Sequence, residues 1–187
     1  MPAGRRTGSV LAAWPRPRRS PAHFLRPRWP VFLKAGHRQQ REVLVYNPAA
    51  GFPRVVVELA YTDVPTAIDW LTRVFGFQEL LRQTVDGIVH HADLDTGGGV
   101  VMLAKAGERL TVPTTGTPAS AQLIVWVEDV DKHHAHSLAE GAQILHEPCN
   151  KPWGLRQYLS LDHENHLWEF TEHLHDVPAH EWGATST

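Results

Sequence analysis

The stretch RVVVELAYTDVPTAIDWLTRVFGF, residues 54–77, decides the fold of this chain. It begins with apolar, β-branched residues that favour a strand, and this strand ends at the helix-capping residues Thr62 and Asp63. Apolar residues then recur at helical spacing, with Pro65 in the first turn and Gly76 as a stop signal. The stretch therefore predicts a strand that leads directly into an amphipathic helix.

Three short strand candidates follow this helix. They cover residues 77–83, 88–95 and 99–105, and the turn signals DG at 86–87 and TGGG at 96–99 separate them. The first half of the pattern therefore has the order β-α-β-β-β.

The same order begins again after a linker rich in Thr, Pro and Gly. AQLIVWVEDV, residues 121–130, is an apolar strand that ends on an acid and a valine, as the first strand does. A helix at 131–142 and strands at 143–148, 155–161 and 166–172 complete a second β-α-β-β-β order. The sequence therefore predicts an α+β fold of two paired βαβββ modules that form a curved mixed sheet around a cleft.

Charge divides the chain into two parts. Residues 1–50 contain ten Arg or Lys and one acid, whereas residues 51–187 contain eight bases and nineteen acids, so the charges are +9 and −11. Half of the prolines also lie in the first part. We expect three regions: a disordered, basic, Pro/Arg-rich extension at 1–50, one domain at 51–175 with modules at 54–105 and 121–173, and a C-terminal tail at 176–187.

Composition limits the location and the partners of the protein. The single cysteine, Cys149, rules out an intramolecular disulfide framework and favours a reducing, cytoplasmic location. No apolar run approaches the roughly 20 residues that a membrane-spanning helix needs. The basic extension has no long apolar segment after its RR pairs, and its prolines break an amphipathic targeting helix. We expect neither a nucleic acid nor a membrane as partner. An open sheet edge after each module favours a homodimer.

The doubled pattern resembles a known superfamily. The segments YTDVPTAIDWLTRVFGF at 61–77 and GLRQYLSLDHENHLWEF at 154–170 are similar to the vicinal oxygen chelate superfamily, which includes glyoxalase I, the bleomycin-resistance proteins and the extradiol dioxygenases. The resemblance covers about 120 residues, 54–173, and is greatest to the bleomycin-resistance or PhnB-like branch. It implies the paired-module fold, which hosts metal enzymes as well as proteins that only bind.

Metal enzymes of that superfamily place ligands at four strand positions. Counting from the strand-ending acids puts these positions on Val56, Met102, Gln122 and Glu169. Val56 has no donor atom, Met102 offers a soft thioether, and only Glu169 is an ordinary ligand. We therefore expect no cofactor. A divalent metal held by a displaced set, with His91 and Glu169 included, is the minority alternative.

Strand alternation predicts which residues share a surface with Glu169. A period of two places Glu58, Met102, Gln122 and Trp126 on the same concave side. We therefore expect these residues to line the cleft, with the two acids as candidate catalytic groups and the other three as ligand-binding groups.

The same parity adds residues from two other strands. With Leu159 and Leu161 taken as core, Arg156 and Tyr158 face the cleft as ligand-binding residues. With Ala92 and Leu94 taken as core, His91 faces the cleft as a candidate catalytic residue. Each has an alternative. The aromatic residues could belong to the core, the arginine could pair with an acid of the cleft as a structural bridge, and the histidine could simply be hydrogen-bonded.

Such a lining suits a planar, polar or cationic organic ligand, because aromatic rings stack on it and carboxylates attract its charge. We expect a metal-independent protein that binds an aromatic or cationic metabolite or antibiotic, as the superfamily's resistance proteins do. The alternative is a lyase, isomerase or other biosynthetic enzyme with Glu169 or Glu58 as general base and His91 or Tyr158 as acid. A metal-dependent glyoxalase or dioxygenase is the third hypothesis.

The histidines of KHHAHS lie on the second predicted helix. His133, His134 and His136 are offset by one, two and three residues, which does not give the facing pair of a helical zinc site. We expect them to lie on a solvated helix face.

Overall fold

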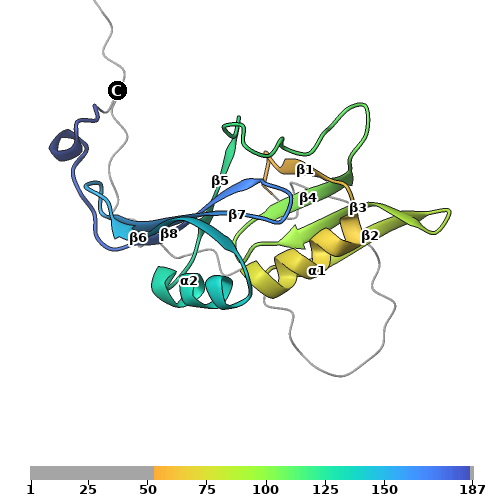
Figure 1. The fold of residues 1–187 in the computed structure, drawn as a ribbon. Coiled ribbons are helices and arrows are strands. Elements are labelled where there is room, and N and C mark those ends of the chain that lie inside the picture. The colour runs from red at the N-terminus through yellow and green to blue at the C-terminus, as the bar shows by residue number, and fades with distance from the viewer. Residues whose placement is uncertain (1–52, 186–187) are drawn as a thin grey trace, which may run out of the picture. The chain divides into compact units, whose positions relative to one another are not determined.

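A computed structural model describes residues 53–185, so the expected 1–50 extension lies outside the described residues. The described chain folds as two βαβββ modules (Figure 1). The first module contains β1 (Val57–Tyr61), α1 (Val64–Phe75), β2 (Gln78–Val85), β3 (Ile88–Asp95) and β4 (Val100–Lys105). The second contains β5 (Gln122–Trp126), α2 (Val130–Ala139), β6 (Gln143–Asn150), β7 (Leu155–Leu161) and β8 (Leu167–His173). A short 3-10 helix, η2 (Ala179–Trp182), follows the second module.

Each module builds its own mixed sheet. Sheet A has the strand order β1-β4-β3-β2, and sheet B repeats it as β5-β8-β7-β6. In each sheet the first pair of strands is parallel and the other two pairs are antiparallel. This repeat confirms the predicted α+β fold of paired modules. No helix within residues 53–185 is long and apolar enough to cross a membrane.

The first helix forms for the local reasons that the sequence suggests. Asp63 caps α1, because its carboxylate accepts a hydrogen bond from the backbone N–H of Thr66. Gly76 ends the helix with a left-handed φ of 73°, which a glycine adopts without strain. The apolar stripe of α1 is buried, as the helical spacing predicts, and consists of Val64, Ala67, Ile68, Leu71, Val74 and Phe75.

One hydrophobic core extends through both modules. Phe75, at the end of α1, has its ring centroid 4.7 Å from that of Phe170 and 5.7 Å from that of Trp168. Phe77 lies 5.4 Å from Trp168. Aromatic residues from the two halves therefore share one apolar volume. This sharing explains why both modules occur in one chain, because a small sheet buries too little surface alone.

Side chains of α2 provide hydrogen-bond partners for the last carbonyls of α1. These contacts are His136 Nε2 with Arg73 O at 2.9 Å, Ser137 Oγ with Val74 O at 3.0 Å, and His133 Nε2 with Phe75 O at 3.1 Å. The final carbonyl groups of a helix have no partner within the helix and need one when they are buried. The prediction of a solvated histidine face is therefore wrong for His133, which lies at the junction of the modules.

A second contact between the modules is centred on Asp162, in the turn between β7 and β8. Its carboxylate is buried and accepts hydrogen bonds from the Tyr61 hydroxyl at 2.6 Å and from Trp168 Nε1 at 3.1 Å. His166 Nδ1 lies 3.1 Å from the same carboxylate, and the backbone N–H groups of Glu164 and His166 donate to it as well. Tyr61 ends β1, so this carboxylate links the first module to the second.

The surroundings of Asp162 and Tyr61 determine the protonation state of each side chain. Burial acts to raise the pKa of Asp162, but the hydrogen bonds and charge of His166, with those of Tyr61 and Trp168, outweigh it and hold that pKa below its ordinary value. Burial and the neighbouring carboxylate raise the pKa of Tyr61. Asp162 is therefore an ionised acceptor and Tyr61 a protonated donor at neutral pH.

Removal of the Asp162 carboxylate should destabilise the fold strongly. Asp162→Ala leaves buried donors without a partner, and we expect a loss of about 3 to 5 kcal/mol in the free energy of unfolding. The milder Tyr61→Phe, which deletes one charged hydrogen bond, should cost about 1.5 to 3 kcal/mol. Urea unfolding measures both. The control Asp176→Ala removes a fully exposed carboxylate and should change stability little, and equal losses in all three variants would contradict a special role for Asp162.

The contact between α2 and α1 should make stability depend on pH. Burial lowers the pKa of His133 below its ordinary value, partly offset by the Phe75 carbonyl. The neutral ring therefore contributes stability that is present above the unfolded pKa of about 6.5 and is lost as pH falls through the lower, folded pKa. His133→Gln, which keeps a donor but does not titrate, should be less stable at pH 8 and should lose less stability between pH 7 and 5. If the unfolding free energies of the unchanged protein and of His133→Gln vary with pH in parallel, His133 does not cause the pH dependence.

Candidate functional site

The face of sheet B that points away from α2 carries four polar residues that are hydrogen-bonded to one another. Gln122 Nε2 donates to Glu169 Oε2 at 2.8 Å, and Gln157 Nε2 donates to Glu169 Oε1 at 2.5 Å. Gln157 Nε2 also lies 2.6 Å from Thr171 Oγ1. We call these four residues the Glu169 network. It joins β5, β8 and β7 on one surface.

Two large apolar side chains lie beside this network on the edge strand β5. The strand register places Ile124 next to Glu169 and Trp126 next to Thr171. The exposed fractions of these two side chains are 57% and 59%. Gln157 and Thr171 are buried and Glu169 is half-buried, so this surface, which we call the open face of sheet B, combines a partly accessible carboxylate with exposed apolar side chains. Trp126 faces this surface, as predicted, and the alternative that it is a core aromatic is wrong.

The charge of Glu169 has no cationic partner in the part of the chain that the structure describes. Both of its carboxylate oxygens accept hydrogen bonds from neutral amide groups. No Lys, Arg or His within residues 53–185 forms an ion pair with it. The two glutamines fix the position of the carboxylate without neutralising it. A positively charged ligand would supply the missing counter-charge.

The corresponding face of sheet A carries a second polar group, centred on His91. Its Nε2 atom lies 2.9 Å from Asp93 Oδ1, and its Nδ1 atom lies 3.5 Å from Glu58 Oε1. The other oxygen of Glu58 accepts a hydrogen bond from Arg109 at 2.8 Å. Met102 lies between Glu58 and Asp93 in the strand register. The structure therefore brings Glu58, His91 and Met102 together as predicted, and both ring nitrogens of the histidine face carboxylates.

The predicted orientation of β7 is wrong. The register pairs Leu159 with Glu169, so these two side chains share the open face, and Tyr158 points to the core on the other side. Tyr158 is 1% exposed, stacks on Phe170 with ring centroids 5.1 Å apart, and bonds His133 Nδ1 at 2.7 Å. Its role is therefore that of a core aromatic.

Arg156 is also displaced from the predicted site. It forms a bidentate pair with Asp131 of α2, at 2.9 and 2.7 Å, and does not contact Glu169 or Glu58. The error arose because Leu159 was taken as a core residue, which reverses every side chain of the strand. The residue that sequence reasoning missed is Gln157. The only sequence signal for Gln157 is its spacing of two residues from Leu159. If Leu159 is placed on the same face as Glu169, Gln157 follows onto that face.

Comparison with known proteins places the chain in a family. A family model described as the Glyoxalase/Bleomycin resistance protein/Dioxygenase superfamily matches residues 53–170. The chain belongs to this superfamily. The match confirms the resemblance that the sequence suggested, and the particular branch stays a prediction. A search of curated proteins gives no match.

Solved structures of the glyoxalase superfamily and its relatives share the fold. The crystal structure of TioX from Micromonospora sp. ML1 is similar with 55% sequence identity and a TM-score of 0.55, and the match covers 67% of this chain and all of TioX. A glyoxalase/bleomycin resistance protein/dioxygenase family enzyme from Burkholderia phytofirmans PsJN gives 20% identity and a TM-score of 0.50 over 64% of this chain and 97% of that one. A hypothetical protein from S. aureus gives 16% sequence identity and a TM-score of 0.52, and the match covers 67% of this chain and 98% of that one. The last two show the fold alone.

The donor set does not fit the divalent metal that many members of the superfamily use. Val56 has no donor atom, Met102 offers only a thioether, and the amide N–H of Gln122 points at the Glu169 carboxylate. A hard divalent cation needs several oxygen or imidazole donors, which this set does not supply. No group of three His, Cys, Asp or Glu side chains among residues 53–185 has the geometry to hold a metal ion.

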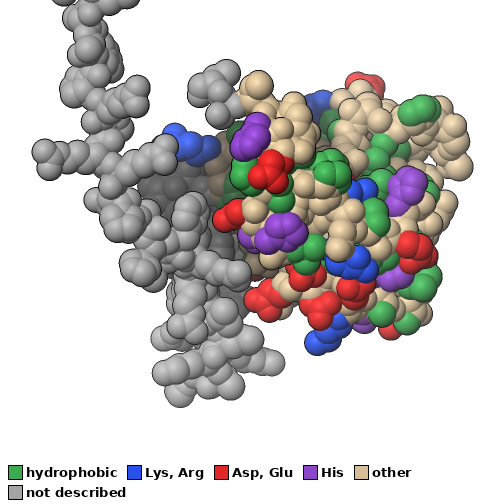
Figure 2. All heavy atoms as spheres, turned by 90° about the vertical axis from the view of Figure 1, so that its left-hand side faces the viewer, with side chains coloured by type: hydrophobic (Ala, Val, Ile, Leu, Met, Phe, Trp, Pro, Cys, Tyr) green, Lys and Arg blue, Asp and Glu red, His purple; other side chains and the backbone are tan. Residues whose placement is uncertain are grey.

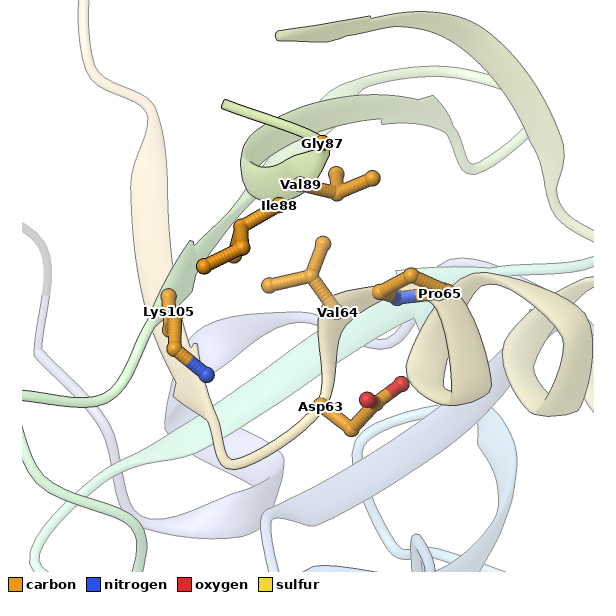
Figure 3. A pocket seen from close by; sticks show the side chains of 7 residues that line it. All are labelled: Asp63, Val64, Pro65, Gly87, Ile88, Val89 and Lys105. Carbon is orange, nitrogen blue, oxygen red and sulfur yellow. The ribbon is translucent and has the colours of Figure 1, made fainter. Parts of the chain in front are cut away.

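The described residues form hollows at two places that do not include Glu169. One, of about 300 Å³, lies at the start of α1, and Val64, Ile88 and Val89 are among the residues that line it (Figure 3). Its charged groups already have partners, because Asp63 caps the helix and Lys105 donates to the carbonyl of Thr62. The other, of about 370 Å³, lies between the modules and includes Trp126.

The surface at the β6 end of the domain carries side chains of several kinds. In Figure 2, charged, histidine and apolar side chains are interspersed there, and acidic groups are most frequent along the lower edge of the face. The carboxylate of Glu169, with exposed apolar side chains beside it, makes the open face of sheet B the candidate ligand site.

Proposed function

We propose that this protein binds a planar aromatic cation on the open face of sheet B and does so without a metal. The observation that carries the proposal is the Glu169 carboxylate, which two glutamines hold in place and no cation neutralises. Beside it, Trp126 and Ile124 expose apolar surface on which a flat ring can stack. A positive charge on that ring would meet both the carboxylate and the indole face.

The comparisons support this class of function. The description of the matching family names the bleomycin resistance proteins, and we include antibiotics as well as metabolites among the candidate ligands. The ligand would reach the site by its charge and be retained by stacking, so the protein would sequester it without chemical change. Metal independence is part of this proposal, and the lack of an ordinary metal donor at Val56 and Met102 supports it.

We also expect the protein to act as a homodimer. Each sheet exposes one open face, and β5 and β1 are edge strands of their sheets. A second copy would cover the exposed Ile124 and Trp126, which a lone chain leaves in water. Such a cover would turn a flat surface into the sheltered site that a small molecule needs.

The charge of Glu169 should determine affinity for a cationic ring. N-methylisoquinolinium and its neutral counterpart isoquinoline have nearly the same shape and differ in charge above pH 7. We expect Glu169→Gln to weaken the cation by about 1 to 2 kcal/mol, or roughly fivefold to thirtyfold in Kd, with little effect on the neutral ring. Calorimetric titration of the full chain, with and without a chelator, measures both affinities, and chelator should change neither.

The matched control is Glu181→Gln, which removes one exposed carboxylate from η2. It changes the net charge by the same amount, so a general electrostatic effect would appear in both variants. Equal weakening of the cation by the two variants, or equal weakening of both ligands by Glu169→Gln, would contradict the proposal. Binding that disappears when a chelator is added would also contradict it.

A further inference from the structure

The hollow between the modules is a second candidate site, separate from the Glu169 network. It lies where the end of α1, the turn between β3 and β4, and the end of β5 meet, and its volume is about 370 Å³. That volume is at the small end of the range for ligand pockets. The residues that line it are Phe75, Gly76, Phe77, Thr96, Gly97, Val125, Trp126, Val127, Glu128 and His133. Glu169 is not among them.

The floor of this hollow is apolar and rigid. Phe75, Phe77 and Val125 are buried members of the shared core, so their positions are fixed by packing on both modules. Trp126 stands at the rim and is largely exposed. An apolar body entering the hollow would contact two phenyl rings and one indole ring, which together remove it from water.

The polar groups of the hollow have partners, with one exception. Both ring nitrogens of His133 are hydrogen-bonded, to the Tyr158 hydroxyl and to the carbonyl of Phe75. The Thr96 hydroxyl donates to the carbonyl of Gly99. Glu128 forms neither a hydrogen bond nor an ion pair with any residue from 53 to 185, and its side chain is exposed. Within the described part of the chain, the hollow therefore presents one carboxylate without a cationic partner, at the edge of an aromatic surface.

We propose that the hollow binds a small protonated amine that carries an apolar group, with the ammonium at Glu128 and the apolar group on the aromatic floor. A cation next to a carboxylate and over aromatic rings gains from both interactions, whereas a neutral or anionic molecule of the same size gains only the apolar contact. The inference does not depend on the proposed function, because the two carboxylates lie at different places and only Trp126 is common to both sites.

Benzylamine, which is protonated at neutral pH, is a suitable probe, and benzyl alcohol is its neutral counterpart. In an amide NMR titration of the full chain, benzylamine should shift the signals of Gly76, Gly97 and Val127, which surround the hollow. Glu128→Gln should weaken benzylamine by about threefold to tenfold and remove its preference over benzyl alcohol.

One further variant makes the test specific. Glu108→Gln removes an exposed carboxylate from the loop after β4 and should leave benzylamine binding unchanged. The amide signals of Gly76, Gly97 and Val127 report on the hollow itself, so the result does not depend on whether a cationic ring binds on sheet B. Equal affinity for benzylamine and benzyl alcohol, an unchanged preference in Glu128→Gln, or shifts confined to residues outside the hollow would each overturn the inference. A dispersed spectrum of Glu128→Gln confirms that this surface substitution leaves the fold intact.

Discussion

The buried carboxylate of Asp162 is the contact on which the arrangement of the two modules depends. It accepts hydrogen bonds from the hydroxyl of Tyr61 in β1, from the indole N–H of Trp168 in β8 and from backbone N–H groups of its own turn. A charge buried in this way is stable only when its donors are all present, so the contact forms fully or costs the fold several kcal/mol. The side chains of α2 that bond the end of α1 secure the same junction on the helical side.

This junction determines where function can lie. The modules meet through their helices, their turns and one shared core. The other faces of the two sheets carry polar side chains, with Glu169 between two glutamines and His91 between two acids. The proposed ligand would provide the cationic partner that Glu169 lacks among residues 53–185.

Much of the fold could be read from the sequence because its signals are local. The capping residue Asp63, the stop at Gly76 and the repeated strand-to-helix pattern all act over a few residues. The placement of Glu58, Gln122, Trp126 and Glu169 on open faces followed from alternation once the strands were known. Alternation failed only where the choice of the core side was ambiguous.

The remaining features depend on contacts between distant parts of the chain. Leu159 is apolar yet faces outward, and this reversed the assignment of Tyr158 and Arg156 and hid Gln157. The role of His133 is visible only when the carbonyl of Phe75 is known to end a buried helix. Asp162 looks like an ordinary turn residue, and its partner Tyr61 is 101 positions away. No local pattern contains that pairing.

The central claim, that a cationic ring binds at the Glu169 network, has a direct spectroscopic test. The side-chain amide groups of Gln122 and Gln157 donate to Glu169, so their NMR signals report on that carboxylate. On titration with N-methylisoquinolinium, both signals should shift and saturate with the same Kd as the indole N–H signal of Trp126. If the ligand binds while the two glutamine signals stay in place, the ligand site is elsewhere and the account of this surface is wrong.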